Sequence, residues 1–185
     1  MFLVSLLLSI LMRLIPEALF FATFVIGAKG LKKGENRAAL ILLFIFTFVV
    51  IGTVFAYDIW LYVVLTVCMF LIMKALIDST EFIDLFLLTI PYIILAVLGF
   101  LCYSIESLFV STDVVGGTML VINRALLIIL IPALYPRLHK WYNAYKKVWN
   151  VHKDNKIKSI TVRNISILVC NAVIIAAYTM LTMVK

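Results

Sequence analysis

Charged residues are scarce in this chain of 185 residues: they make up 14% of it, against about a quarter of an ordinary soluble domain. Glycine is also scarce, with seven residues, whereas apolar residues account for 65% of the sequence. This balance excludes a soluble kinase, a nucleotide-binding fold and a DNA-binding domain. The apolar residues form uninterrupted runs, which excludes the alternating pattern of a transmembrane β-barrel.

Signatures of enzymes and metal sites are missing as well. The only histidines are His139 and His152, outside the apolar runs, so no intramembrane haem pair, HExxH motif or His/Cys cluster can form. Cys68, Cys102 and Cys170 lie inside apolar runs without metal-ligand spacing. A membrane peptidase would need a cytoplasmic cysteine near a histidine, which this pattern does not offer. We therefore expect no catalytic residue, no metal and no cofactor.

Six apolar runs approach or exceed the roughly 20 residues that a helix needs to cross a bilayer. We expect one all-α, polytopic membrane domain over residues 1–185, a bundle of about six transmembrane helices. Its predicted spans are residues 2–28, 38–56, 59–77, 82–105, 118–136 and 164–184. Asp78-Ser79-Thr80-Glu81 has the spacing of a capping box before the fourth span. Pro91 predicts a kink within that span.

Basic residues in the short loops predict the orientation of the bundle. With Lys74, at the end of the third span, counted with the loop that follows it, the loops after the first, third and fifth spans hold thirteen lysines and arginines, whereas the opposite side holds only Lys185. The positive-inside rule then predicts a basic cytoplasmic loop at residues 137–163 and both termini outside. We expect a multi-pass protein of a bacterial cell membrane.

Arg13 and Glu17 are four residues apart inside the first span, on one face of a helix. An unpaired charge at such a depth costs about 2.5–3.5 kcal/mol on insertion scales, so we expect both to pair, with each other or with neighbouring helices. Three interpretations stay open. The pair lines a ligand or ion pocket, it only fixes the packing, or the crossing starts later so that Arg13 lies at the membrane interface.

Further polar residues fall within the later spans. Asp84, a turn into the fourth span, is a candidate partner for a proton or cation, with Lys74 nearby in sequence. Arg124 in the fifth span either snorkels to the outer surface or pairs with Glu106 or Asp113. The candidates for a ligand site or polar core are Arg13, Glu17, Asp84, Arg124 and Asn171.

Residues 138–149 interleave aromatic and basic side chains at helical spacing. This pattern is typical of an amphipathic interfacial helix whose rings lie at headgroup depth and whose lysines contact anionic lipid. The interfacial candidates are Lys140, Trp141, Tyr142, Tyr145, Lys146, Lys147 and Trp149. The alternative is a cytoplasmic extension of the fifth helix that transmits motion or docks a protein.

The layout of the chain resembles the six-helix membrane-sensor region of peptide-responsive bacterial sensor kinases of the accessory-gene-regulator type. The likeness rests on a first helix without a basic leader, a tight basic loop at 29–37, a charged stretch at 74–84 and the basic aromatic segment at 137–163. It covers all six spans. The resemblance concerns the membrane region alone, and no site residue can be transferred because no motif is shared.

Three functions follow as hypotheses. The first is a non-enzymatic membrane receptor or regulatory subunit that binds a small peptide or lipid-like ligand and acts through a partner. The second is the substrate-binding membrane subunit of a transporter, and the third is a structural or assembly protein. The expected partners are the bilayer, anionic lipids on the cytoplasmic side, and a protein partner or second copy. Nucleic acid is not expected, because the excess of bases lies beside a membrane span.

Overall fold

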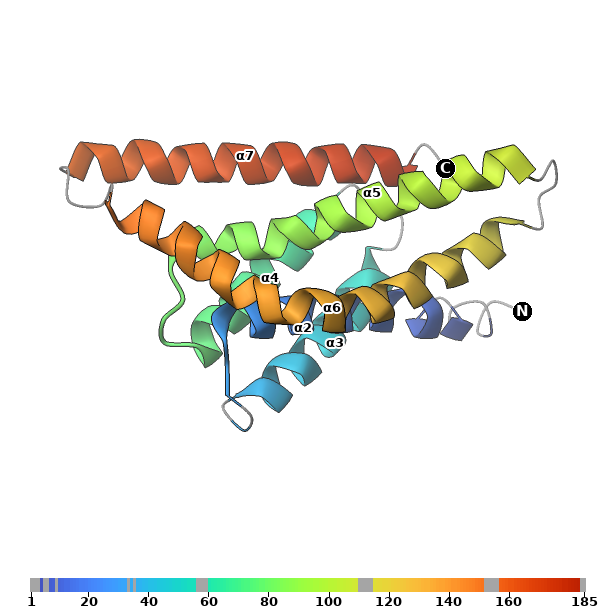
Figure 1. Ribbon diagram of the computed structural model, residues 1–185, viewed down its shortest axis with the longest axis horizontal. Coiled ribbons are helices and arrows are strands. Elements are labelled where there is room, and N and C mark those ends of the chain that lie inside the picture. The colour runs from blue at the N-terminus through green and yellow to red at the C-terminus, as the bar shows by residue number, and fades with distance from the viewer. Residues whose placement is uncertain are drawn as a thin grey trace.

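The computed structural model describes residues 4, 7–8, 10–32, 34, 36–55, 60–109, 115–151 and 157–183. Over these ranges the chain consists of helices and turns, without a strand, which confirms the all-α prediction (Figure 1). The elements in chain order are η1 (Ile10–Leu14, a π-helix), α2 (Ile15–Lys29), α3 (Arg37–Val54), α4 (Leu61–Leu76), η2 (Phe82–Asp84), α5 (Leu85–Phe109), α6 (Val115–Val151) and α7 (Ile157–Met183).

Several of these helices have the length and composition of membrane spans. Among the described residues, three qualify by both measures: Ile10–Lys29, Arg37–Val54 and Phe82–Cys102. Leu61–Leu76 and Asn164–Ala177 are shorter apolar helices. Length and composition therefore support three crossings directly, against the six that the apolar runs predict.

The long helices run up and down in alternation. The C-terminal ends of α2 and α6 lie at the same end of the bundle as the starts of α5 and α7 (Figure 1). At this end the side chain of Asn36, before α3, also donates a hydrogen bond to the carbonyl of Leu76, the last residue of α4. We call it the base-rich end, because Lys29 is the last residue of α2 and the C-terminal part of α6 carries Lys140, Lys146 and Lys147.

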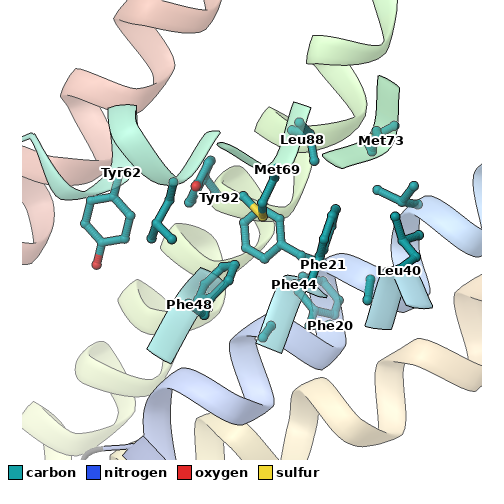
Figure 2. Packing of buried hydrophobic residues seen from close by; sticks show 14 of the residues in the cluster. Phe20, Phe21, Leu40, Phe44, Phe48, Tyr62, Met69, Met73, Leu88 and Tyr92 are labelled. Atoms are coloured by element: carbon teal, nitrogen blue, oxygen red, sulfur yellow. The ribbon is translucent and has the colours of Figure 1, made fainter. Parts of the chain in front are cut away.

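The interior of the bundle is filled by aromatic side chains from α2, α3 and α5, joined by Met69 and other residues of α4 (Figure 2). The ring of Phe21 lies 5.3 Å from that of Phe48 and 4.7 Å from that of Tyr92, measured between centroids. In a bilayer, such close packing contributes to helix association, because lipid removes most of the hydrophobic driving force. Large apolar side chains such as Phe46 point outward instead, as lipid contact requires.

Two glycines permit close approach between elements. A Cβ atom on Gly27 of α2 would lie 3.0 Å from Cδ2 of Tyr135, so α6 packs directly against the α2 backbone. A Cβ atom on Gly52 of α3 would lie 2.8 Å from Cδ2 of Leu14 in η1. The continuous segment of η1 and α2 thus packs against α3 near its start and against α6 near its end, although α3 and α6 lie far apart in sequence.

Helix α6 corrects two sequence predictions. Residues 138–149 do not form a separate interfacial helix, because α6 continues without interruption from Val115 to Val151. The predicted basic loop of residues 137–163 is mostly helical, since α6 occupies its first part and α7 begins at Ile157. The physical reason is tertiary packing: Leu138 and Tyr142 continue the face of α6 that packs on α2 and α5. The helix passes through both Pro132 and Pro136.

The capping box at the start of the fourth span lies three residues later than the sequence predicts. The capping box is formed by Glu81 and Asp84, not by Asp78 and Glu81 as the spacing suggests. The side-chain Oδ2 of Asp84 accepts a hydrogen bond from the backbone N–H of Glu81 at 2.8 Å. The predicted start of the helix at residue 82 agrees with η2, which begins at Phe82.

The contact between Gly52 and Leu14 leads to a first prediction. We expect Gly52→Ala to lower the stability of the bundle in detergent by about 1–3 kcal/mol, because the added methyl group overlaps the Leu14 side chain. In a Leu14→Ala background the same substitution should cost much less, since the overlapping methyl groups are gone. Thermal unfolding of the four chains measures the difference, and an equal loss in both backgrounds would contradict the packing.

Candidate functional site

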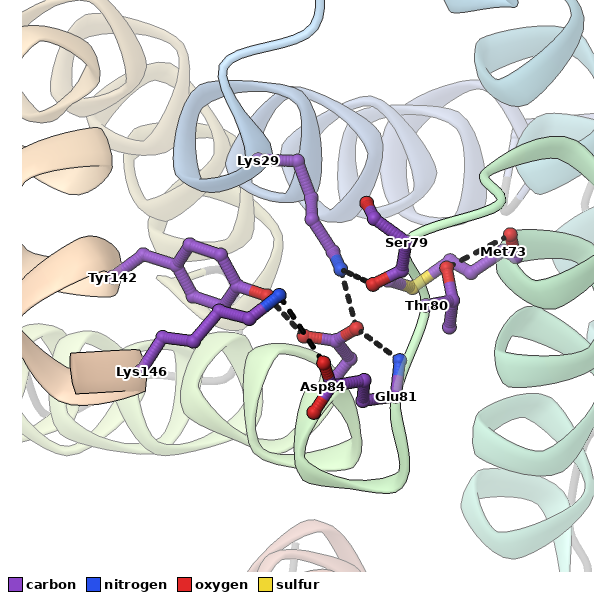
Figure 3. A network of polar contacts seen from close by, with 8 residues as sticks. All are labelled: Lys29, Met73, Ser79, Thr80, Glu81, Asp84, Tyr142 and Lys146. Atoms are coloured by element: carbon purple, nitrogen blue, oxygen red, sulfur yellow. Dashed lines mark hydrogen bonds and ion pairs between the residues drawn. The ribbon is translucent and has the colours of Figure 1, made fainter. Parts of the chain in front are cut away.

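Asp84 is the centre of a polar network at the base-rich end (Figure 3). Its side chain is fully buried at the start of α5. The carboxylate forms an ion pair with Lys29 of α2, accepts a hydrogen bond from Tyr142 of α6 at 2.6 Å, and accepts the backbone N–H of Glu81. A buried carboxylate is stable only when such donors replace the water it has lost. Asp84 therefore ties three helices to one point.

Lys29 is the last residue of α2, and only 3% of its side chain is exposed. Its ammonium group also donates to the backbone carbonyl of Ser79 at 3.1 Å and lies 5.3 Å from the centre of the Tyr142 ring. The position suits a cation, because carbonyl groups at a helix C-terminus carry partial negative charge. Lys29 thus joins α2 to the connection between α4 and α5.

Tyr142 brings α6 into the network. Its ring is buried in a small apolar cluster with Phe24, Ala28 and Leu87. Burial, and next the hydrogen bond to Asp84, raise the pKa of the Tyr142 hydroxyl far above its usual range. The hydroxyl therefore stays protonated and acts as the donor to the carboxylate.

A second ion pair lies at the rim of the network. The Lys146 ammonium of α6 is 3.4 Å from Oε1 of Glu81, and both side chains are partly exposed. Solvent screens such a pair, so it adds little stability by itself. The pair does bring the C-terminal part of α6 next to Glu81, the residue that precedes η2. We refer to Lys29, Glu81, Asp84, Tyr142 and Lys146 together as the latch.

His139 fastens α6 to the end of α2 beside the latch. Its Nδ1 lies 3.0 Å from the carbonyl oxygen of Ala28, which can only accept, so Nδ1 carries the proton. Its Nε2 then accepts a hydrogen bond from the Asn143 side chain at 3.0 Å. Gly30 is required here twice over: its φ is +70°, and a Cβ atom would lie 2.5 Å from the imidazole ring.

The sequence located Asp84 correctly as a residue with a charged partner, but it named the wrong partner. Lys74 lies exposed near the end of α4, and the partner is Lys29. The sequence analysis counted Lys29 only as a base of the loop at 29–37. It did not predict that Lys29 or His139 contributes to a polar site. The position of Lys29 directly before Gly30 could have indicated its role, because helices often end at a glycine and a cation is favoured at a helix C-terminus.

The interfacial assignments are partly wrong. Tyr142 does not face lipid, because it is buried against Asp84, and Lys146 is engaged by Glu81. Tyr145 is half-buried, with its ring 6.1 Å from that of Phe86. Three of the candidates are exposed, namely Lys140, Trp141 and Lys147. The side chains of Trp149 and Arg124 lie outside the described residues.

A separate polar centre surrounds Arg13. The predicted contact with Glu17 is present, with 3.8 Å between Nε and Oε1, and Arg13 also donates to the hydroxyl of Tyr62 on α4 at 2.8 Å. The Glu17 side chain is 3% exposed and that of Arg13 is 34% exposed. Thr66 extends the polar groups by donating to the Tyr92 hydroxyl at 3.1 Å. This centre joins η1 and α2 to α4.

Asn171 is buried in α7 and belongs to neither group of contacts. Its side-chain nitrogen donates to the carbonyl of Ile167 at 2.7 Å. Its side-chain oxygen finds no hydrogen-bond partner within the described ranges. Those ranges also contain no cluster of three or more His, Cys, Asp or Glu side chains arranged to hold a metal ion.

Comparison with known protein families, with curated proteins and with solved structures finds no match. The latch must therefore be interpreted from its geometry. A buried ion pair between separate helices is costly to break, since removing one partner leaves an uncompensated charge.

The ion pair of the latch yields a second prediction. We expect Lys29→Met and Asp84→Asn each to destabilise the bundle by about 3–5 kcal/mol, because each leaves a buried group without its partner. The double variant should lose clearly less than the sum of the two, since no lone charge remains.

A double-mutant cycle by thermal unfolding in detergent measures this coupling. Lys74→Met is the matched control: it removes an exposed base of the same end and should change stability by less than about 0.5 kcal/mol. Strictly additive losses for Lys29 and Asp84 would contradict a coupled pair.

Proposed function

We propose that the chain is an integral membrane receptor or regulatory subunit that acts through a partner protein and has no catalytic activity of its own. The observation that carries this proposal is the latch, which holds α6 to α2 and α5 at a single end of the bundle. Intramembrane and membrane-edge ionisable groups are functional by default, because their cost would otherwise select against them.

The proposal includes six crossings of a cell membrane, with the base-rich end in the cytoplasm and both termini outside. The alternation of α2 to α7 supports it, because the thirteen basic loop residues then fall on one side. The length of α6 supports it too. Its 37 residues extend about 55 Å, whereas the hydrocarbon core is about 30 Å thick, so α6 projects beyond the membrane.

In this proposal α6 is the element that transmits the signal. A small peptide or lipid-like ligand that shifts the outer half of α6 would strain the contacts of Tyr142 and Lys146 at the other end. The latch then opens, and the projecting end of α6 changes its position toward a cytoplasmic partner. A ligand can drive this change only by binding one arrangement more tightly than the other.

A transporter subunit is the second candidate, and the Arg13 centre favours it, because charged groups inside spans line substrate pathways in many transporters. The packed aromatic interior argues for the receptor instead. The space between α2 and α3 is filled by four phenylalanine side chains, each at most 1% exposed, namely Phe20, Phe21, Phe44 and Phe48 (Figure 2).

The orientation gives a third prediction. In a chain with Cys68, Cys102 and Cys170 replaced by serine, Trp60→Cys should react with an impermeant maleimide on intact cells, because Trp60 is exposed at the start of α4. Lys147→Cys should react only after permeabilisation. Both should react in detergent, which serves as the control. Labelling of position 147 on intact cells would overturn the orientation.

The partner gives a fourth prediction. A photo-crosslinking residue at Lys147, exposed near the end of α6, should capture a signalling enzyme whose activity differs between wild-type and Lys29→Met chains. The same residue at Val67, exposed on the apolar surface of α4, should not capture it. Capture of an ATPase would favour the transporter, and capture of neither would favour a structural role.

A further inference from the structure

The outward side of α6 beyond Pro136 carries bases that the latch does not use. Arg137, Lys140 and Lys147 are all exposed, and the helical period places them on the side of α6 opposite Tyr142. No ion pair connects them to an acid within the described part of the chain, where the Glu81 carboxylate is engaged by Lys146. This side of the helix is therefore a strip of positive charge next to the predicted membrane edge.

Helix geometry places these bases at different depths. If the hydrocarbon core ends near Pro136, a rise of 1.5 Å per residue puts Arg137 about 1.5 Å and Lys140 about 6 Å beyond it. The headgroup layer on each side is about 5–7.5 Å thick, so both lie within it. Lys147 lies about 16 Å out, which is past the headgroups. A tilt of about 20° shortens these depths by only about 6%.

Trp141 adds a second observation at the outer edge of this layer, about 7.5 Å beyond Pro136. It is 42% exposed, and its ring stacks on that of Tyr145 with centroids 5.7 Å apart and planes at 5°. Tryptophan is enriched at the membrane–water interface, where its apolar ring and its N–H group are both accommodated. The ring therefore marks the same layer that the helix arithmetic assigns to Arg137 and Lys140.

We propose that Arg137, Lys140 and Trp141, here called the headgroup ridge, bind the headgroup of an anionic phospholipid. Arg137 and Lys140 are three residues apart, so their side chains leave the helix as neighbours and can reach one phosphate. Arginine suits this role because its guanidinium binds phosphate through two hydrogen bonds. Lys147 contributes little, since it lies beyond the headgroup layer.

This inference deepens the proposed function, and it rests on the predicted end of the fifth span at residue 136. A lipid held on the ridge fixes α6 directly beside the latch, so the lipid composition of the leaflet sets how readily α6 moves. The contact needs no partner protein. Failure to find a partner would therefore refute the proposed function without changing the lipid measurement.

The test uses the full chain in lipid nanodiscs with Trp60→Phe and Trp149→Phe, so that Trp141 is the only tryptophan. Quenching of its fluorescence by brominated phosphatidylglycerol, compared with brominated phosphatidylcholine, reports which lipid lies beside the ridge. We expect a clear preference for phosphatidylglycerol. Each of Arg137→Gln and Lys140→Gln should reduce it about fivefold, the factor that corresponds to one base near an anionic surface.

Lys147→Gln is the matched control and should leave the preference within about twofold of the parent. Raising the salt to 1 M should remove most of it, because the screening length falls to about 3 Å. Equal quenching by the two lipids in the parent chain would overturn the proposal and leave the ridge to an acidic protein. Equal losses in all three glutamine variants would overturn the assignment of depth, since Lys147 would then share the headgroup layer.

Discussion

A carboxylate cannot remain ionised inside an apolar bundle unless donors surround it, and the arrangement of the base-rich end follows from meeting that condition at Asp84. The donors come from three places: the end of α2, the backbone before η2, and the extension of α6. Each donor reaches Asp84 only if the helix or turn that carries it begins, ends or continues at a particular residue. Lys29 must end α2, Glu81 must precede the turn of η2, and α6 must stay helical as far as Tyr142.

The bounds of α3 and α4 were predictable from composition to within a few residues, because an apolar run long enough to cross a bilayer has almost no alternative to a helix. The prediction of residues 38–56 matches α3 at Arg37–Val54, and that of 59–77 matches α4 at Leu61–Leu76. The length of α6 was not predictable in this way. Pro136 and the following bases resemble a helix end, but contacts of Leu138 and Tyr142 with α2 and α5 outweigh that local signal.

The charged residues of the polar centres were predictable, and so was the contact of Arg13 with Glu17, but the partners of Asp84 were not. Depth in an apolar run identified Asp84, Arg13 and Glu17, since an ionisable group there must find a partner. The spacing of Tyr142 showed that it lies on a common face with Leu138, but spacing does not say whether that face meets lipid or protein. Only the packing of α6 against α2 decides this, and it turns a residue expected at the membrane surface into a donor of the latch.

Helix α2 connects the two polar centres, which gives it a particular place in the bundle. It carries Glu17 near its start and Lys29 at its end, and most of its residues between them are buried. A helix that is apolar on all sides belongs at the centre of a bundle, and Gly27 lets α6 approach its backbone closely. Helix α2 is held at its start by the contact of Arg13 with Tyr62 and along its length by aromatic packing. Of the elements that the latch joins to α2, α6 is the longest. The receptor that we propose would therefore transmit its signal by a displacement of α6 relative to α2.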